Sequence, residues 1–255
     1  MKIKVLGCSG AEFPGHNPPG FLLDDAVLFD AGSLTNVLNG RAQEGVNYIF
    51  ITHAHLDHIR GIPFLADNLL IKDGGHKVNI VSIPPVIRTI RDNLLNGQVW
   101  PDFTILPNPK NGVLKFLAAR EGRSIRINGL TVTPYRVNHS VPAVGYLVED
   151  RRGKRFFYTG DTGPADATWK KVGNRQLHCL IIEVSFPNRM KEVAITTGHL
   201  TSALLQEELS KIGRAPEKIY ITHPKPQYFA IIEKELKDLG LRNLRLLRDG
   251  DILKI

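Results

Sequence analysis

Residues 53–58 read His53-Ala54-His55-Leu56-Asp57-His58, so four side chains that can bind a metal occur within six residues. They follow Tyr48-Ile49-Phe50-Ile51-Thr52, a short apolar run with β-branched residues that predicts a buried strand. A turn that leaves this strand and begins a helix can direct His53 and His55 at one ion and Asp57 and His58 at another. Imidazole and carboxylate groups together suit zinc or a neighbouring first-row metal. The stretch therefore predicts a metal site where a buried strand ends.

Strand and helix patterns extend on both sides of this stretch. Strands are expected over residues 2–8, 20–24, 26–31, 124–137, 143–149, 155–159, 180–185, 218–222, 241–247 and 251–255. Helices are expected over residues 84–95, from 201 onward and over about 228–239, while residues 96–123 read as irregular. Ile51-Thr52-His53 and Ile221-Thr222-His223 each close a strand before a loop and a helix. This echo predicts two similar β/α halves within one domain spanning residues 1–255.

The composition is that of an ordinary soluble protein. Of 255 residues, 42% are hydrophobic and 23% charged, which excludes disorder as the main state. No run of about 18 apolar residues exists, so no transmembrane helix and no membrane partner are expected. The first residues reach Cys8 and Ser9 before an apolar segment develops, so no signal peptide is expected. Two cysteines make no disulfide framework, and a cytoplasmic location is predicted.

Positive charge is concentrated in the second part of the chain. Residues 1–100 hold eight basic and nine acidic side chains, whereas residues 101–255 hold 25 and 16. A basic half indicates an anionic partner such as a nucleotide, a nucleic acid or a membrane surface. A solvated basic surface without a partner is the alternative.

The six-residue string resembles the metal-binding motif of the metallo-β-lactamase superfamily of dinuclear hydrolases. Further matching stretches follow the family's order: Phe29-Asp30-Ala31-Gly32, Val137-Asn138-His139-Ser140, Tyr158-Thr159-Gly160-Asp161-Thr162-Gly163 and Ile221-Thr222-His223. The resemblance implies an α/β fold, a four-layer αββα sandwich of two β/α halves with the metals at one edge between the sheets. It also implies that Asp30 accepts a hydrogen bond from a metal-bound histidine and orients it.

The resemblance assigns a role to each candidate ligand. It implies that the first metal is bound by His53, His55 and His139. It implies that the second is bound by Asp57, His58 and His223, that Asp161 bridges both, and that Asp57 is also catalytic. The expected cofactors are two divalent ions, Zn²⁺ before Mn²⁺ or Fe²⁺. Two such ions can share a water and lower its pKa towards neutral, giving a bridging hydroxide, and they neutralise charge on a phosphoryl oxygen.

Two further residues resemble those of the phosphodiesterase branches of the superfamily. Glu183 ends a predicted strand, and His199 lies in Gly198-His199-Leu200-Thr201 just before a helix. In the tRNA 3′-processing endonucleases, a glutamate orients a histidine that protonates the departing oxygen. The resemblance thus implies that Glu183 orients His199 and that His199 is the general acid. The alternatives are a helix N-terminal contact for His199 and a structural ion pair for Glu183.

Three details favour the class II cyclic-nucleotide phosphodiesterases over the tRNA enzymes. Leu56 precedes Asp57 where the tRNA enzymes usually have glycine. The stretches 99–104 and 222–226 resemble a Trp-Pro-Asp segment and a C-terminal histidine-lysine-proline motif. No long basic arm of the kind that grips tRNA is apparent, and Arg60 departs from the signature, which expects a small residue there.

The predicted function is therefore hydrolysis of 3′,5′-cyclic nucleotides, cyclic AMP or cyclic GMP, by a dinuclear metal-dependent phosphodiesterase. The alternatives are an RNA 3′-end endonuclease of the RNase Z type and a metallohydrolase of another ester; a scaffold without catalysis would lack such a complete ligand set. A small nucleotide is the expected partner in preference to nucleic acid, and a homodimer is left open. Trp100 and Phe103 could form an aromatic wall for a purine or pack in the core or a dimer. Lys225 could contact phosphate or be solvated.

Overall fold

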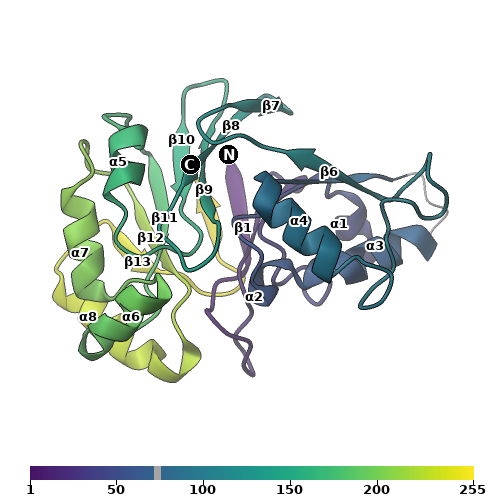
Figure 1. Ribbon diagram of the computed structural model, residues 1–255. Helices are drawn as coiled ribbons and strands as arrows, with labels where there is room; N and C mark the ends of the chain where they lie inside the picture. Colours follow the sequence, from purple (N-terminus) through teal and green to yellow (C-terminus); the bar gives the residue numbers. More distant parts are fainter. Residues whose placement is uncertain (72–75) are drawn as a thin grey trace.

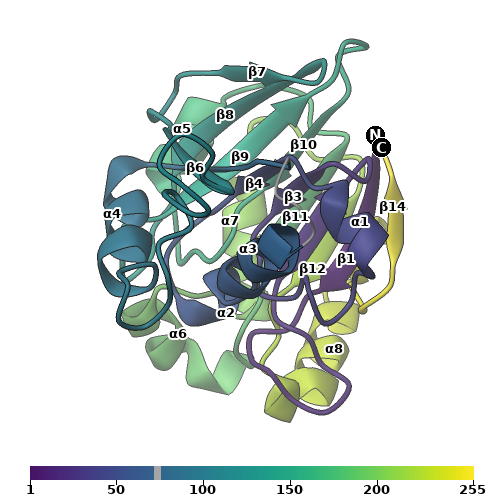
Figure 2. The ribbon, with the colours of Figure 1, turned by 90° about the vertical axis from the view of Figure 1, so that its right-hand side faces the viewer.

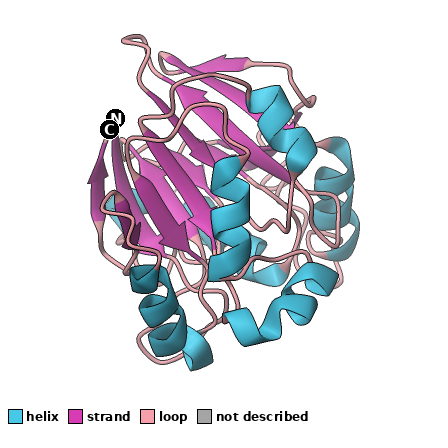
Figure 3. Cartoon of the chain, turned by 90° about the vertical axis from the view of Figure 1, so that its left-hand side faces the viewer, coloured by secondary structure: helices cyan, strands magenta, loops and turns pink. Residues whose placement is uncertain are grey.

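The computed structural model describes residues 1–71 and 76–255 and has four layers (Figure 1). Two seven-stranded mixed sheets face each other in the middle. Helices α1, α3 and α4 lie outside the first sheet, α2 lies at the lower edge of the sheets, and α5 to α8 lie on the side of the second sheet (Figures 1 and 2). Figure 3 shows the second group of helices in front of the strands that they cover. The predicted αββα sandwich is confirmed.

The element bounds are as follows. The first sheet contains, in spatial order, β14 (Ile252–Lys254), β1 (Lys2–Gly7), β2 (Gly20–Leu23), β3 (Val27–Phe29), β4 (Tyr48–Phe50), β5 (Val78–Ser82) and β6 (Leu114–Ala118). The second contains β13 (Leu244–Leu246), β12 (Ile219–Thr222), β11 (Cys179–Glu183), β10 (Arg155–Tyr158), β9 (Val144–Glu149), β8 (Leu130–Arg136) and β7 (Ile125–Ile127). The helices are α1 (Gly40–Glu44), α2 (Leu56–Ile59), α3 (Gly61–Ile71), α4 (Pro84–Asn93), α5 (Asp166–Val172), α6 (Lys191–Thr197), α7 (Ser202–Ser210) and α8 (Phe229–Asp238), with 3₁₀ turns η1 (Asn188–Met190) and η2 (Pro226–Tyr228).

The two sheets repeat one pairing pattern. From β14 to β3 neighbouring strands are antiparallel, and from β3 to β6 they are parallel. The second sheet runs antiparallel from β7 to β10 and parallel from β10 to β13. The expected similarity of the halves is present, but the two Ile-Thr-His motifs follow strands that are not equivalent in the two sheets. The counterpart of β4 is β11, and the counterpart of β12 is β5.

An aromatic cluster between the sheets supports the strand ends that carry the candidate ligands. The Phe29 ring lies 5.4 Å from Phe50 and 5.6 Å from Phe156, and the Phe50 ring lies 5.3 Å from Tyr146. All four side chains are fully buried. The Tyr146 hydroxyl donates to the Ile51 carbonyl at 2.7 Å. Edge-to-face and offset ring packing of this kind adds to the stability that area burial gives, and here it fixes the end of β4 just before His53.

Some elements differ from the sequence expectation. Residues 124–137 form a hairpin, β7–β8, because Asn128 and Gly129 both adopt positive φ, the geometry of a tight two-residue turn. Strands β5 and β6 and helices α1, α3, α5 and α6 were not predicted. In α3, Gly61 and Pro63 interrupt the helical signal, and tertiary packing overrides their low propensity. Within the described ranges, no helix has the length and apolar character needed to cross a bilayer.

Candidate metal centre

All seven predicted ligands meet at one edge of the two sheets, on the loops and the short helix that follow strands. His53 and His55 follow β4, Asp57 and His58 lie in α2, and His139, Asp161 and His223 follow β8, β10 and β12 respectively. One ligand atom each from His53, His55, His139 and Asp161 lie within 4.8 Å of one another, and so do those of Asp57, His58 and His223. The two groups correspond to the two sets that the sequence analysis assigned to separate ions.

Asp161 lies between the two groups. Its Oδ2 atom is 3.6 Å from His53 Nε2, 3.4 Å from His58 Nε2 and 3.3 Å from His223 Nε2. Zn–N bonds of about 2.0–2.1 Å in a tetrahedron place neighbouring ligand atoms about 3.3 Å apart. The spacing of these atoms is therefore that of ligands around a common small cation.

Four of the five histidines present a defined nitrogen to the centre because the other nitrogen has a protein partner, which for His53 is the Thr52 hydroxyl at 3.0 Å. The Nδ1–H of His58 donates to Asp30 at 2.8 Å, and that of His139 donates to the Gly198 carbonyl at 2.9 Å. His223 Nδ1 lies 2.8 Å from Ser185 Oγ. These rings turn Nε2 inward, whereas His55 turns Nδ1 inward, 3.1 Å from His53 Nε2. Such partners fix the tautomer and orientation of metal-binding imidazoles.

The buried Nε2 atom of His58 shows that the residues fit a cation. It has no hydrogen-bond partner among residues 1–71 and 76–255, although it lies 3.4 Å from Asp161 Oδ2. Because Nδ1 carries the proton shared with Asp30, Nε2 and the carboxylate oxygens that face it need a positive species between them, either a proton on Nε2 or a metal ion. The donor set of imidazoles and carboxylates suits zinc or a neighbouring metal.

The charges of the cluster point the same way. Burial opposes ionisation of Asp161, but His223 and His58 hold the pKa of its carboxyl group well below the usual range. Burial also opposes protonation of His58, yet Asp161 and Asp30 raise the pKa of its imidazole well above normal. Burial, together with the neighbouring His58, lowers the pKa of His53. The centre thus keeps its carboxylates charged and leaves part of its imidazoles neutral, as metal binding requires.

Asp30, fully buried, anchors this edge of the site. Its carboxylate accepts from the Thr52 backbone N–H at 2.8 Å, the Thr52 hydroxyl at 2.9 Å, the Tyr158 hydroxyl at 2.7 Å and His58 Nδ1. A contact between Asp30 and a metal-binding histidine was predicted from the sequence, whereas the contacts with Thr52 and Tyr158 were not. The position of Thr52 directly before His53 was the available signal.

We expect Asp30→Asn to weaken metal binding by about 10–100-fold, the usual effect of losing such an outer partner. The amide cannot accept from all the donors that face it, so the His58 ring loses its fixed orientation. Competition with a chromogenic chelator measures the affinity. Asp92→Asn, on the exposed side of α4, is the matched control. Equal affinity in wild type and Asp30→Asn would contradict this role.

Beside the predicted ligands, Glu183 and His199 form a buried pair. Glu183 Oε1 lies 2.6 Å from His199 Nδ1, and the His199 ring stacks on His223 with centroids 5.5 Å apart. Gly198 ends α6 with φ 74°, and a Cβ there would lie 2.8 Å from the His139 backbone. Glycine is therefore required to deliver His199 to this position.

The pair keeps a proton close to the metal ligands. Burial opposes protonation of His199, but the charge and hydrogen bond of Glu183 raise its pKa to about 9. Nδ1 is held by Glu183, so a proton for a bound molecule has to leave from Nε2. One side-chain nitrogen of His199 also lies within 4.8 Å of ligand atoms of Asp161 and His223. The arrangement can deliver a proton at the edge of the metal centre.

Ser185, which sequence reasoning did not single out, connects this pair to a predicted ligand. Its hydroxyl donates to Glu183 Oε2 at 2.7 Å and lies 2.8 Å from His223 Nδ1. Glu183 additionally accepts from the Thr162 backbone N–H at 3.0 Å, next to Asp161. One carboxylate thus positions both His199 and the loop of Asp161.

The structure decides the alternatives for Phe103 and gives the contacts of three other residues. Phe103 is only 1% exposed within the main hydrophobic cluster, so it is a core residue and no wall for a purine. Trp100 is half-buried and packs against Phe64 with ring centroids 5.3 Å apart. The Lys225 ammonium donates to the Gly10 carbonyl. Arg60, the departure from the signature, pairs with Glu12 and donates to the Gly32 carbonyl.

Comparisons with known proteins agree with this geometry. The model of the beta-lactamase superfamily domain matches residues 25–223. A probable 3′,5′-cyclic-nucleotide phosphodiesterase of Yersinia pestis is 29% identical over 83% of this chain and 69% of its own length. A ribonuclease Z of Archaeoglobus fulgidus is 24% identical over 89% of this chain and 88% of its own. The crystal structure of unliganded yeast PDE1 superposes with a TM-score of 0.85 at 18% identity, covering 100% of this chain and 99% of that one, a likeness of fold.

Proposed function

The chain belongs to the beta-lactamase superfamily, and from that premise we propose that it is a metal-dependent phosphodiesterase that hydrolyses 3′,5′-cyclic nucleotides. The observation that carries phosphodiester hydrolysis is the buried Glu183–His199 pair, 2.6 Å apart, beside the predicted metal ligands. An alkoxide leaving group needs a proton, and this pair holds one. Relatives named 3′,5′-cyclic-nucleotide phosphodiesterase support the substrate class.

We assign two divalent ions to the centre, with Zn²⁺ as the expected metal. His53, His55 and His139 would hold one, Asp57, His58 and His223 the other, and Asp161 both. Ions bound there would supply an activated water and neutralise charge on a phosphoryl oxygen. A cytoplasmic location remains a prediction, and a homodimer remains open.

The protein's own residues then have distinct tasks. Asp57, with 29% of its side chain exposed, is reached by solvent and would orient the attacking water as well as bind metal. As the phosphorus–oxygen ester bond breaks, His199 gives its Nε2 proton to the departing ribose oxygen. Glu183 holds the Nδ1–H and stabilises the positive ring. The attacking water forms the new bond to phosphorus, and a proton that it releases restores the charged form of His199, so the product is a nucleoside monophosphate.

A second candidate is an RNA 3′-end endonuclease. The ribonuclease Z relative aligns over more of its own length than the Yersinia relative does, 88% against 69%. The basic second part of the chain also suits a polyanion. Both candidates use the same metal ligands and the same proton donor, so the substrate alone separates them.

We expect cyclic AMP or cyclic GMP to be cleaved with a much higher kcat/KM than any precursor tRNA. Steady-state assays on the metal-loaded protein, with bis(p-nitrophenyl) phosphate as the non-specific reference, make the comparison. A His53→Ala preparation, purified identically, controls for contaminating phosphodiesterases. A higher kcat/KM for precursor tRNA would establish the second candidate in place of the first.

A further inference from the structure

Residues 8–17, between β1 and β2, form a hairpin that projects from the lower edge of the molecule, next to α2 in Figure 1 and next to α8 in Figure 2. At its tip the backbone N–H of Phe13 donates to the His16 carbonyl at 3.2 Å, and that of His16 donates to the Phe13 carbonyl at 2.8 Å. Pro14 and Gly15 form the turn, and Gly15 adopts φ 76°. Proline before a glycine with positive φ is typical of a type II turn. The hairpin therefore has a defined shape of its own.

The base of this hairpin is fixed against a predicted metal ligand. The Asp249 carboxylate accepts from the backbone N–H of Cys8 at 3.1 Å and of Asn17 at 2.8 Å, which are the two ends of the hairpin. A Cβ on Gly10 would lie 2.7 Å from His223 Nδ1, so glycine is needed for the backbone to pass this close to the ligand. The hairpin thus begins at the ligand that follows β12.

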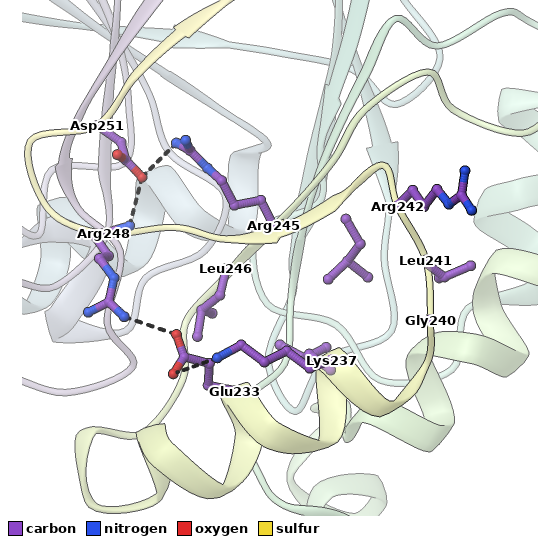
Figure 4. A pocket seen from close by; sticks show the side chains of 11 residues that line it. Glu233, Lys237, Gly240, Leu241, Arg242, Arg245, Leu246, Arg248 and Asp251 are labelled. Atoms are coloured by element: carbon purple, nitrogen blue, oxygen red, sulfur yellow. Dashed lines mark hydrogen bonds and ion pairs between the residues drawn. The ribbon is translucent and has the colours of Figure 1, made fainter.

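One side of the hairpin tip packs on the start of α8. The His16 ring lies 5.7 Å from the Phe229 ring, and the Arg248 guanidinium lies over the Phe229 ring at 5.1 Å. Arg248 in turn donates to Glu233 at 2.9 Å, an ion pair that Figure 4 shows in the groove between α8 and β13. Because Phe229 is held in this way, the His16 side of the tip has a fixed support.

The other side of the tip is joined to the helix that carries two predicted ligands. The Glu12 carboxylate accepts from Nη1 of Arg60, the residue that ends α2 after Asp57 and His58. Nε of Arg60 donates to the Gly32 carbonyl at 2.8 Å, so two partners hold one planar guanidinium. The Arg60 side chain is 24% exposed and that of Glu12 is 65% exposed. A small residue, which the phosphodiesterase signature has at position 60, could not reach Glu12.

The attachment points of the hairpin lie on both sides of Asp57. His223 Nε2 is 3.4 Å from Asp57 Oδ2, and Arg60 is about one helical turn further along α2. Of the three ligands assigned to the second ion, Asp57 has 29% of its side chain exposed, whereas His58 and His223 have 0% and 1%. Solvent therefore reaches this half of the centre at Asp57, next to the hairpin.

We propose that the Glu12–Arg60 pair determines substrate size, because it holds the hairpin close to Asp57 and so narrows the approach to the metal centre. The proposal rests on the proposed function and deepens it. A cyclic nucleotide has no chain beyond its ribose and fits beside a held hairpin. A polynucleotide continues on both sides of the scissile phosphate and needs the room that the hairpin occupies. Glu12 and Arg60 act through the hairpin and are positioning residues.

Steady-state kinetics of the metal-loaded protein tests the pair with bis(p-nitrophenyl) phosphate, cyclic AMP and a short oligoadenylate. Glu12→Ala should raise kcat/KM for oligoadenylate, relative to bis(p-nitrophenyl) phosphate, by about three- to fivefold, the size of shift that loss of an exposed ion pair can give. The kcat/KM for cyclic AMP should not rise. Glu12→Lys, which repels Arg60, should raise the oligoadenylate ratio further. Glu121→Ala, which removes an exposed ion pair with Lys171, is the matched control and should keep the wild-type ratio.

A double-mutant cycle separates the contact from a general effect on the fold. Once Arg60→Ala has removed the partner, adding Glu12→Ala should leave the oligoadenylate ratio unchanged. Metal content and the thermal unfolding midpoint of Glu12→Ala should match those of the wild type. No gain on oligoadenylate in Glu12→Ala, or effects of the two changes that simply add, would overturn the proposal. The ratio does not involve cyclic AMP, so failure to hydrolyse cyclic AMP would refute the proposed substrate and leave this test valid.

Discussion

His55→Ala should reduce hydrolysis of every substrate to background and lower the metal content of the protein. His55 Nδ1 lies 3.1 Å from His53 Nε2 and 3.3 Å from His139 Nε2, so alanine removes one of four converging ligand atoms. With fewer donors the affinity falls, and without the ions neither an activated water nor charge neutralisation is supplied. Inductively coupled plasma mass spectrometry should find close to two transition-metal ions per wild-type chain and fewer in the variant.

The matched control for this change is His178→Ala. His178 accepts from the Arg155 backbone N–H at 3.0 Å and contacts none of the predicted ligands. The His178→Ala variant should keep the metal content and the activity of the wild type. Full activity in wild-type protein stripped of metal and held under chelator would refute the metal-dependent mechanism as a whole.

His199→Ala should lower kcat on a cyclic nucleotide by about 10²–10⁴-fold, the usual contribution of a positioned general acid. The ribose alkoxide is a poor leaving group and needs the proton that Glu183 keeps on the ring. Nitrophenolate leaves without help, so the loss on bis(p-nitrophenyl) phosphate should be much smaller. The metal content should stay at the wild-type level, since the role assigned to His199 is proton donation.

Glu183→Gln extends the test because it changes the orienting group and retains the donor. It should show the same dependence on the leaving group with a smaller loss. Ser185→Ala removes the hydroxyl between Glu183 and His223. Its activity shows how much the hydrogen bonds next to the Glu183–His199 pair contribute. If His199→Ala slowed both substrates equally or lost a metal, His199 would be a ligand or a structural residue.

The sequence was informative where function is concentrated in a short stretch. Residues 53–58 carry four donors within six positions, and their resemblance to a known family extends to the separate positions of His139, Asp161 and His223. Site residues of common types, outside any recognisable motif, could not be identified from the sequence. Tyr158 donates to Asp30 across 128 positions of the chain, and only the folded sheets bring the two together.

The prediction of some secondary-structure elements failed for a related reason. Gly61 and Pro63 weaken the local preference for helix in α3, yet packing against the first sheet fixes it. The two halves were inferred from an Ile-Thr-His repeat that lies on non-equivalent strands. The two halves are similar in the order and direction of their strands. A short repeated motif does not reveal this similarity, because it depends on how all the buried side chains pack.

The predicted ligands are far apart along the chain, with Asp57 and His223 separated by 166 positions. During synthesis, a chain that has reached α2 offers the donors of residues 53–58 alone, and coordination is complete only after β12 has been made and the sheets have docked. Contacts of such long range require the entropy of closing the intervening chain to be paid first. Ion capture should therefore follow docking of the sheets, and its binding free energy should stabilise the finished fold without stabilising earlier intermediates.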